Sequence, residues 1–422
     1  MIKKLISIGA VVLVVALLLT LAPACGKEKE EVTPTPGVTP TPGVTPTPTP
    51  KAETLKIGLI LPLSGPMAGY GVPYEAGVKW AADRINDAGG FKVGADIYKI
   101  KVVSCDDMFT PSKCGECAAR LVYDEGVKYN VGPIGGPLAM VVMDLLNDNK
   151  IITSDVASWV PLLGPDYPYH ILGFPLGFDG EWVRGFVGKV LEYHPEIKTI
   201  GIIGMEPWKD LWMVGEREAA EAYGLTVVAE ATYVPGTTDF YPTLIKVLAK
   251  RPDVITMTNC GPGDLALMIK QARELGYRGI LYAPGAVPLD ILFATAGKEA
   301  AEGFLNNLPD YTNPVWPEAT RALHQDYMNR YPNLEMYTTT MSGYVSVNLY
   351  VKAIQLAGTT DTDAVVAVFD DPDFTFDFMG AEVKFGGREF YGAARVFPFP
   401  QAFSVIKNGE LEQLELFWVE VP

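Results

Sequence analysis

The fold of this chain is decided by residues 54–90, which read TLKIGLILPLSGPMAGYGVPYEAGVKWAADRINDAGG. Residues 55–61 are apolar nearly throughout, which is typical of a strand buried on both faces of a parallel sheet. The loop 62–71 carries three glycines, which let a backbone turn and approach a bound molecule closely. We expect a helix that starts at Pro73 and ends at the Gly-Gly pair 89–90. Such a unit is either an ordinary βα unit or, through free N–H groups at the helix start, a polar-ligand site.

The same alternation of strand and helix patterns continues along most of the chain. Further strands are expected at 98–104, 128–134, 151–154, 170–174, 199–204, 225–233, 253–258 and 279–282. Helices are expected at 112–125, from the Gly-Gly-Pro at 135–137 to 147, and at 179–193, 209–223, 241–250, 264–275 and 289–295. The tail predicts long helices at 317–331 and 337–356, strands near 381–385 and 394–407, and an Asn408-Gly409 turn. Repeated βα units imply parallel sheets with right-handed crossovers, and their number implies two α/β lobes.

Composition narrows the class of protein. A chain of 422 residues with 48% apolar residues can bury more than one large core. Its net charge of −16 excludes nucleic-acid binding through bulk charge and favours solubility. The three histidines lie far apart without metal-ligand spacing, so no metal or other cofactor is expected.

The cysteines leave several pairings open. Cys25 belongs to the N-terminal segment, and the other four permit three pairings. Cys114 and Cys117 have CxxC spacing, but no second such pair accompanies them, so a disulfide or buried thiols are favoured over zinc. Because Cys105 ends a predicted strand just before this helix, a bridge from Cys105 to Cys114 or Cys117 is the preferred interpretation. Cys260 has no assigned partner.

The N-terminus predicts export and anchoring. Two lysines followed by the apolar run 5–21 are typical of a secretory signal. The small residues before Cys25 resemble a bacterial lipobox, in which the cysteine is diacylated and becomes the mature N-terminus. Two acyl chains give stable membrane anchoring. An uncleaved membrane anchor or cleavage elsewhere is the alternative.

A low-complexity linker follows the anchor. Residues 33–50 repeat TPTPGV, and frequent proline forbids helix and removes backbone donors. At ~3.1 Å per residue such an extended segment holds a domain roughly 55 Å from a surface. We interpret it as a spacer.

Ligands of open α/β sheets bind beyond the carboxyl ends of the strands. These ends fall at 64–71, 106–107, 135–137, 157–159, 206–208, 259–263 and 284–286. They are rich in glycine, proline and aromatic residues, and they contain no nucleophile elbow, Walker loop or dinucleotide fingerprint. Asp106-Asp107 reads either as paired catalytic carboxylates or, more simply, as caps of the following turn and helix. Such a cleft favours binding a small molecule over transforming it, so no enzyme activity is expected.

Several motifs together resemble the periplasmic leucine/isoleucine/valine-binding proteins, the type I solute-binding proteins of ABC transporters. The motifs are LKIGLILPLSGPMAGYG with AADRINDAGG, YNVGPIGGP, SDVAS, PDVITMTN with KQARELGYRG, and GYVSVNLYVKAI. The resemblance covers residues 54–409. It implies two doubly wound parallel-sheet lobes joined by a three-segment hinge, with crossovers near Gly173, Asn306 and Phe397, and a ligand held between the lobes.

The resemblance also implies ligand contacts. Tyr70 matches the aromatic residue of the family's first loop. Ala157-Ser158 matches an Ala-Thr pair that holds the α-amino and α-carboxylate groups of the ligand. Trp208 matches an aromatic residue after the first strand of lobe two, and Tyr344 matches a tyrosine of the last long helix.

Other matching positions depart from the family. Contacts are expected from Gly135, Gly136 and Pro137, and from Gly261 and Gly285, but the family's carboxylate-binding serine falls at Gly136 and its acidic residue at Gly285. The family's lobe-two tyrosine, near Gly261, is also absent. A buried ammonium without an acidic partner would be costly. We therefore expect a small organic acid or aromatic compound in preference to leucine, with an amino acid as the remaining alternative.

The expected protein is an extracytoplasmic solute-binding lipoprotein, a monomer that closes on its ligand and docks on an ABC permease. A ligand-presenting sensor with the same fold is one alternative, and a secreted enzyme is the least favoured. The expected segments are the signal peptide 1–24, the tether and linker 25–53, lobe one at 54–174 with 306–397, and lobe two at 175–305 with 398–422.

Overall fold

The computed structural model describes residues 52–156, 160–174, 180–206, 209–258, 260–285 and 287–421. The expected signal segment, the lipidation site at Cys25 and the Thr/Pro-rich linker lie outside these residues, so they stay predictions. In the described part of the chain, none of the helices combines the length and the apolar composition that a membrane crossing requires.

The first sheet has, among the described residues, six strands in the order β2-β3-β1-β4-β5-β6. Its strands are β1 (Ala52–Leu61), β2 (Phe91–Val93), β3 (Asp96–Asp106), β4 (Tyr129–Ile134), β5 (Ile152–Val156) and β6 (His170–Phe174). Neighbouring strands are parallel, except that β2 pairs antiparallel with β3. The predicted parallel sheet is therefore confirmed, with an added antiparallel edge strand.

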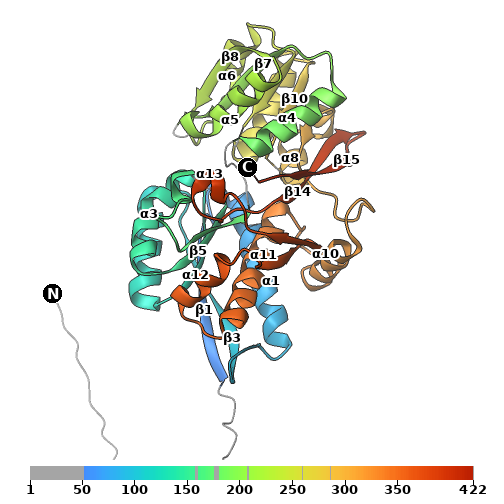
Figure 1. Ribbon diagram of the computed structural model, residues 1–422. Helices are drawn as coiled ribbons and strands as arrows, with labels where there is room; N and C mark the ends of the chain where they lie inside the picture. Colours follow the sequence, from blue (N-terminus) through green and yellow to red (C-terminus); the bar gives the residue numbers. More distant parts are fainter. Residues whose placement is uncertain are drawn as a thin grey trace, which may run out of the picture. The chain divides into compact units, whose positions relative to one another are not determined.

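Helices cover both faces of this sheet. They are α1 (Ala68–Asp87), α2 (Pro111–Ala119), which continues as a π-helical segment (Arg120–Glu125), α3 (Gly136–Asp148) and α11 (Thr338–Ala357), with a short 3-10 turn (Val160–Leu162) after β5. Ile60 packs with α2 and α3, whereas Leu59 and Leu61 pack with α1 and α11. Figure 1 shows α3 on one side of the sheet and α1 and α11 on the other. The unbroken apolar run of β1 follows from this double coverage.

The predicted start of the first helix was wrong. Helix α1 begins at Ala68, so Pro73 lies inside it and not at its first position. The N–H groups of Tyr70 and Gly71 donate to the Met67 carbonyl and close the first turn. A Cβ on Gly71 would lie 2.1 Å from the Pro62 carbonyl oxygen. This glycine therefore lets the helix start against the end of β1.

Helices α1 and α11 cross at two glycines. A Cβ on Gly77 would lie 1.8 Å from the Thr340 carbonyl oxygen, and one on Gly343 would lie 2.3 Å from that of Tyr74. Only residues without a side chain allow the two backbones to approach this closely. The crossing fixes α11, a late part of the chain, to the first sheet.

The second sheet has, within the described ranges, seven strands in the order β15-β14-β11-β10-β9-β7-β8. Its strands are β7 (Thr199–Met205), β8 (Thr226–Tyr233), β9 (Val254–Met257), β10 (Ile280–Ala283), β11 (Leu305–Asn306), β14 (Phe399–Lys407) and β15 (Glu410–Val419). The five neighbouring strands from β8 to β11 run parallel, and β14 and β15 add antiparallel strands.

Helices cover both faces of the second sheet. Residues of α4 and α5 pack on one face, and those of α6, α7 and α8 pack on the other. Those helices and the short α9 are α4 (Glu181–Tyr193), α5 (Lys209–Ala222), α6 (Tyr241–Leu248), α7 (Pro262–Glu274), α8 (Leu289–Thr295) and α9 (Lys298–Ala301).

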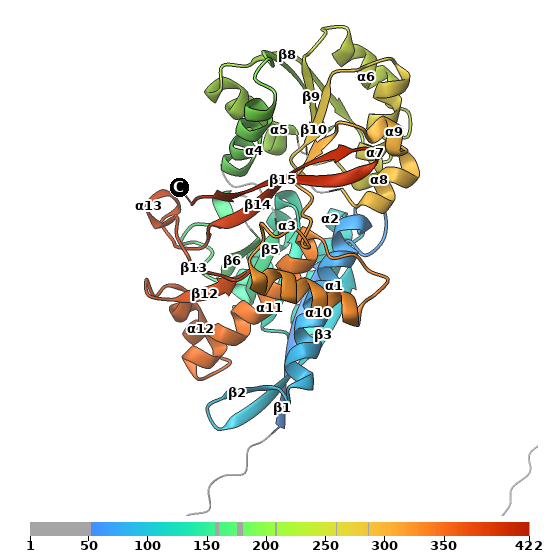
Figure 2. The same cartoon turned by 90° about the vertical axis from the view of Figure 1, so that its right-hand side faces the viewer.

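The C-terminal part of the chain packs helices on the first sheet and adds two strands to the second. It contains α10 (Glu318–Arg330), α11, α12 (Thr362–Phe369), the antiparallel pair β12 (Thr375–Phe378) and β13 (Ala381–Lys384), and α13 (Arg388–Tyr391). The β14–β15 hairpin, shown in Figure 2, then joins the second sheet. The chain thus passes between the sheets after β6, after β11 and before β14, close to the predicted crossovers. Sequence analysis missed β15 and started β14 five residues early.

Candidate functional site

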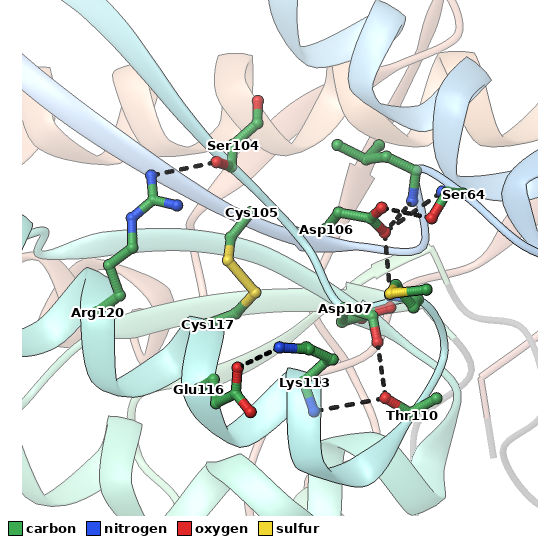
Figure 3. Close-up of a disulfide and its surroundings, with 12 residues drawn as sticks. Ser64, Ser104, Cys105, Asp106, Asp107, Thr110, Lys113, Glu116, Cys117 and Arg120 are labelled. Carbon is green, nitrogen blue, oxygen red and sulfur yellow. Dashed lines mark hydrogen bonds and ion pairs between the residues drawn. A yellow bond between two sulfur atoms is a disulfide. The ribbon is translucent and has the colours of Figure 1, made fainter. Parts of the chain in front are cut away.

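We call the first sheet with its helices lobe one and the second lobe two. The rim of lobe one (residues 62–67, 106–110 and 135–137) is organised by Asp106, at the end of β3. Its Oδ1 accepts the N–H groups of Leu63 (2.9 Å), Ser64 (3.3 Å) and Met108 (2.9 Å), and its Oδ2 accepts the Ser64 hydroxyl (2.6 Å), as Figure 3 shows. Burial opposes ionisation, but these bonds outweigh it and lower the pKa of Asp106 below its usual value. Asp106 is therefore an ionised strut that holds the first loop.

Asp107 has a local structural role. Its side chain is fully buried and its Oδ1 accepts the Phe109 N–H at 2.7 Å, which forms a turn before α2. Thr110 then caps α2 by accepting the Lys113 N–H. Burial raises the pKa of Asp107 to about 6, with a further contribution from the charge of Asp106. The capping interpretation of the two aspartates is confirmed, since both side chains accept from the turn that follows.

The disulfide links Cys105 and Cys117, one of the two expected pairings with Cys105. It fastens the end of β3 to α2 next to the Asp106 network, as Figure 3 shows. Cys114 is a free, buried thiol, and burial raises its pKa strongly, which makes it a poor nucleophile. Among the described residues, no group of three or more side chains has the arrangement of a metal site.

The rim of lobe two (residues 206, 258, 260–264 and 283–285) lies where β7, β9 and β10 end. Its Asp264, in the first turn of α7, accepts the Tyr233 hydroxyl at 3.1 Å. Burial raises the pKa of Asp264, and the bond from Tyr233 partly offsets this effect. Cys260 is a buried free thiol beside this pair.

Tyr70 brings the two rims together. Its hydroxyl, from α1 of lobe one, donates to the Cys260 carbonyl of lobe two at 3.3 Å, and burial raises the pKa of this hydroxyl. A Cβ on Gly285 would lie 3.6 Å from the same hydroxyl, and a Cβ on Gly261 would lie 3.5 Å from Met67 Sδ. Three predicted site residues, Tyr70, Gly261 and Gly285, are therefore neighbours. The space beside the two glycines is occupied by lobe one, so they do not enlarge a ligand cavity at these points.

Gly135, Gly136 and Pro137 lie where β4 meets α3. Gly135 has φ 93°, a conformation that favours glycine, and its Cβ would lie 3.5 Å from the Phe109 ring and 3.9 Å from the Trp212 ring. Trp212 belongs to α5 of lobe two. Gly135 therefore faces lobe two, and ligand contacts at Gly135, Gly136 and Pro137 stay predictions.

Tyr344 is not brought to the other predicted residues. Its ring packs 4.1 Å from that of Trp80, and the Arg84 guanidinium lies 5.6 Å from its centre. Tyr344 lines a groove of about 640 Å³ between α10, α11 and β12, all of which belong with lobe one. Because α11 is buried on most of its surface, the helical pattern of apolar residues does not reveal which face its tyrosines occupy.

Ala157, Ser158 and Trp208 lie outside the described residues, so their roles remain predictions. Sequence analysis missed the Cys260 carbonyl as the partner of Tyr70, because a backbone acceptor has no signature in the sequence. It also missed Met67, which faces Gly261 across the lobes.

Comparison with known proteins agrees with this architecture. A family model described as periplasmic binding protein matches residues 54–395. The Leu/Ile/Val-binding protein homolog 3 of Brucella melitensis is 26% identical over 317 residues, covering 74% of this chain and 82% of that protein. The leucine-, isoleucine-, valine-, threonine- and alanine-binding protein of Pseudomonas aeruginosa is 26% identical over 326 residues, covering 74% and 81%.

Solved structures share the fold. The branched-chain amino acid transporter substrate-binding protein of Streptococcus pneumoniae, in complex with isoleucine, aligns with a TM-score of 0.73 at 20% identity, covering 86% of this chain and 99% of that one. A solute-binding protein of an ABC transporter from Rhodopseudomonas palustris, in complex with benzoate, aligns with a TM-score of 0.71 at 18% identity, covering 86% and 96%. With the family model spanning most of the chain, this protein belongs to the periplasmic binding protein family and is an extracytoplasmic solute-binding protein, not an enzyme.

Proposed function

We propose that this protein is the lipid-anchored solute-binding component of a branched-chain amino acid type ABC transporter. It captures a small organic solute between its lobes and delivers it to a membrane permease. The observation that carries the proposal is the meeting of Tyr70 with Cys260 and Gly285, and of Met67 with Gly261, because it sets the strand ends of the two lobes against each other. Ligand-driven closure of such a pair of lobes is a shift of population toward the conformation that binds more tightly.

The proposed ligand is a small organic acid or aromatic carboxylate. Relatives of this chain are named for branched-chain amino acids, and one structural neighbour contains benzoate. Position 285 offers no carboxylate for an ammonium group, and Asp264 already accepts a hydrogen bond from Tyr233. Ala157, Ser158, Gly136 and Trp208 are the proposed contacts that would orient the ligand.

Calorimetry tests the ligand class. The protein is unfolded, dialysed and refolded to remove any bound compound, and then titrated with benzoate, leucine, isoleucine and valine. We expect benzoate to bind and the aliphatic amino acids to bind at least tenfold more weakly. Submicromolar binding of leucine would overturn the ligand class while supporting solute binding. Native mass spectrometry of the untreated protein then identifies any compound that purifies with it.

Anchoring through Cys25 has a separate test. We expect the exported protein to incorporate labelled palmitate and to sediment with membranes, and a Cys25→Ala variant to lose both properties. Equal labelling of the variant would contradict the lipoprotein assignment. The proposed lobe boundaries, 54–174 with 306–397 and 175–305 with 398–422, and the monomeric state are tested by limited proteolysis and by sedimentation.

A sensor that presents the same solute to a receptor is the second candidate, since the fold serves both roles. Loss of solute uptake in cells that lack the protein favours transport.

A further inference from the structure

A carboxyl group is buried beneath the rim of lobe two. Glu216 lies on α5 with no exposed surface. Its Oε1 accepts the Thr256 hydroxyl at 2.8 Å, and its Oε2 accepts the Tyr282 hydroxyl at 2.5 Å. Thr256 and Tyr282 are register partners on the adjacent strands β9 and β10. A single side chain therefore ties one helix to two neighbouring strands, whose arrangement is seen in Figure 2.

The three tied elements all lead into the candidate site. Strand β9 continues within a few residues to Cys260 and Gly261, which face Tyr70 and Met67 of lobe one. Strand β10 continues to Gly285, which also faces Tyr70. Helix α5 begins at Lys209, just after the end of β7 and the predicted ligand contact Trp208, and carries Trp212, which faces Gly135.

A buried carboxyl is an expensive way to join a helix to a sheet. Removing it from water costs free energy that its hydrogen bonds repay only in part, whereas apolar packing between α5 and the sheet carries no such cost. The α5 neighbours Met213, Ala219 and Ala220 are buried apolar residues that supply such packing. The two hydroxyl bonds add what apolar packing lacks, which is a fixed position of α5 on the two strands, whose own register the β9–β10 ladder sets.

We propose that Glu216 is a positioning residue of the ligand site: by accepting from Thr256 and Tyr282, it holds the start of α5 in a fixed position against the ends of β9 and β10, where these three elements meet the solute and lobe one. The inference rests on the proposed solute-binding function and assigns no ligand contact to Glu216 itself.

The electrostatics of the site support this role. Burial raises the pKa of Glu216 to about 7, and the hydroxyls of Tyr282, Thr256 and Thr258 lower it in part. The Thr258 hydroxyl lies near the carboxyl but forms no hydrogen bond with it. No charged side chain of the described residues takes part in this shift. An ionised carboxylate accepts stronger hydrogen bonds than a protonated one, so the two ties are strongest above this pKa.

Hydrogen exchange of the whole protein tests the positioning without any ligand. Tyr282→Phe removes the tie to β10 alone, and Thr256→Val removes the tie to β9 alone. We expect about tenfold faster amide exchange at 283–287 in the first variant and at 258–263 in the second, each with little change at the other segment. Tyr277→Phe is the matched control, because its hydroxyl contacts the Asp253 and Ile280 carbonyls at the opposite end of β10. Equal loosening of both segments by either variant, or none, would overturn the proposal.

The second measurement uses whichever compound of the panel benzoate, leucine, isoleucine and valine binds the wild type. We expect its affinity to increase about tenfold as the pH rises through 7, and Glu216→Gln to abolish this step. A step that persists in the variant, or is absent from the wild type, would contradict the proposal. If no compound of the panel binds, the proposed ligand class fails, whereas the exchange experiment still decides the role of Glu216.

Discussion

The two rims hold their strand ends with opposite electrostatic devices. In lobe one, Asp106 is partly exposed, accepts four hydrogen bonds and has a lowered pKa, and the Cys105–Cys117 disulfide lies beside it. In lobe two, Glu216 is fully buried, accepts two hydroxyl groups and has a raised pKa, with no disulfide among the described residues of that lobe. Folding thus favours the ionised form of the carboxyl in lobe one and the protonated form of the carboxyl in lobe two.

This difference has a consequence for pH. A carboxyl whose pKa is lowered by folding stabilises the protein at neutral pH, and this stabilisation is lost as the pH falls through the folded pKa. A carboxyl whose pKa is raised stabilises the protein at low pH, and this stabilisation is lost as the pH rises through the folded pKa. Acidification should therefore destabilise lobe one, whereas a rise in pH from 4.5 to about 7 should destabilise lobe two.

The largest expected effect concerns Glu216. Between its ordinary pKa of 4.5 and its folded pKa of about 7, the native state binds the extra proton, so the free energy of unfolding falls as the pH rises. The full loss amounts to about 3 kcal/mol. We expect Glu216→Gln to lack this loss, so that the difference in unfolding free energy between variant and wild type grows by that amount from pH 4.5 to 8.

Urea unfolding at several pH values measures this difference. Asp107, with a pKa of about 6, gives a slope of the same sign in both proteins and cancels in the comparison. Glu230→Gln is the matched control. Glu230 lies on β8 and pairs with Arg217, the residue that follows Glu216 on α5, and this pairing lowers the pKa of Glu230. Parallel curves for wild type and Glu216→Gln would refute the raised pKa.

The next effect concerns lobe one alone. The disulfide closes a loop of 12 residues, and removing it frees the unfolded chain. We expect the Cys105→Ser/Cys117→Ser double variant to lose about 2 to 3 kcal/mol of unfolding free energy. Thermal unfolding of the variant, compared with reduced and oxidised wild type, measures the loss. Reduced wild type should behave as the variant does, and a reductant should leave the variant unchanged.

Sequence reasoning succeeded where a local pattern determines the structure. The apolar run of β1, the capping role of Asp106-Asp107 and the turn at Asn408-Gly409 follow from local chemistry, and the structure confirms them. The parallel cores follow from the order of these patterns, whereas the three crossovers were implied by the resemblance to the solute-binding family. The helix start at Pro73 was wrong because Ala68–Gly71 form a first turn that has no strong helix signal of its own.

The candidate site was only partly accessible from the sequence. Gly261 and Gly285 were placed correctly at strand ends, but their role of admitting Met67 and Tyr70 depends on how the lobes meet, which no local pattern encodes. Tyr344 packs on Trp80 and not at the rim. The sequence did not reveal this, because α11 is apolar on most sides and its pattern does not show which face a tyrosine occupies. Glu216 did leave a signal: it is an acidic residue three positions from the buried Met213 and Ala219, on the buried face of α5.

A smaller effect is expected at Asp106. In Asp106→Asn the amide keeps one acceptor oxygen for the N–H groups of Leu63 and Met108, but it loses the charge that strengthens these bonds. We expect a loss of about 1 to 2 kcal/mol at pH 7 that is smaller at pH 3, because the stabilisation by the charge declines as the pH falls below the ordinary pKa of 3.8 toward the lowered pKa of Asp106. Urea unfolding at the two pH values measures the loss. A loss that is equal at both would attribute the effect to shape and not to charge.

The smallest effect tests where the rims meet. Tyr70→Phe removes the hydroxyl that donates to the Cys260 carbonyl across the lobes while leaving the ring in place. Because this bond forms only when the lobes are together, its loss should weaken ligand affinity by about fivefold, or about 1 kcal/mol, with little change in unfolding free energy. Tyr344→Phe is the control: its ring packs on Trp80 within lobe one, so affinity should not change. If Tyr344→Phe weakened binding and Tyr70→Phe did not, the ligand would lie away from the contact between the rims. Titration of both variants with the same compound therefore decides between the two tyrosines that the sequence alone placed in one site.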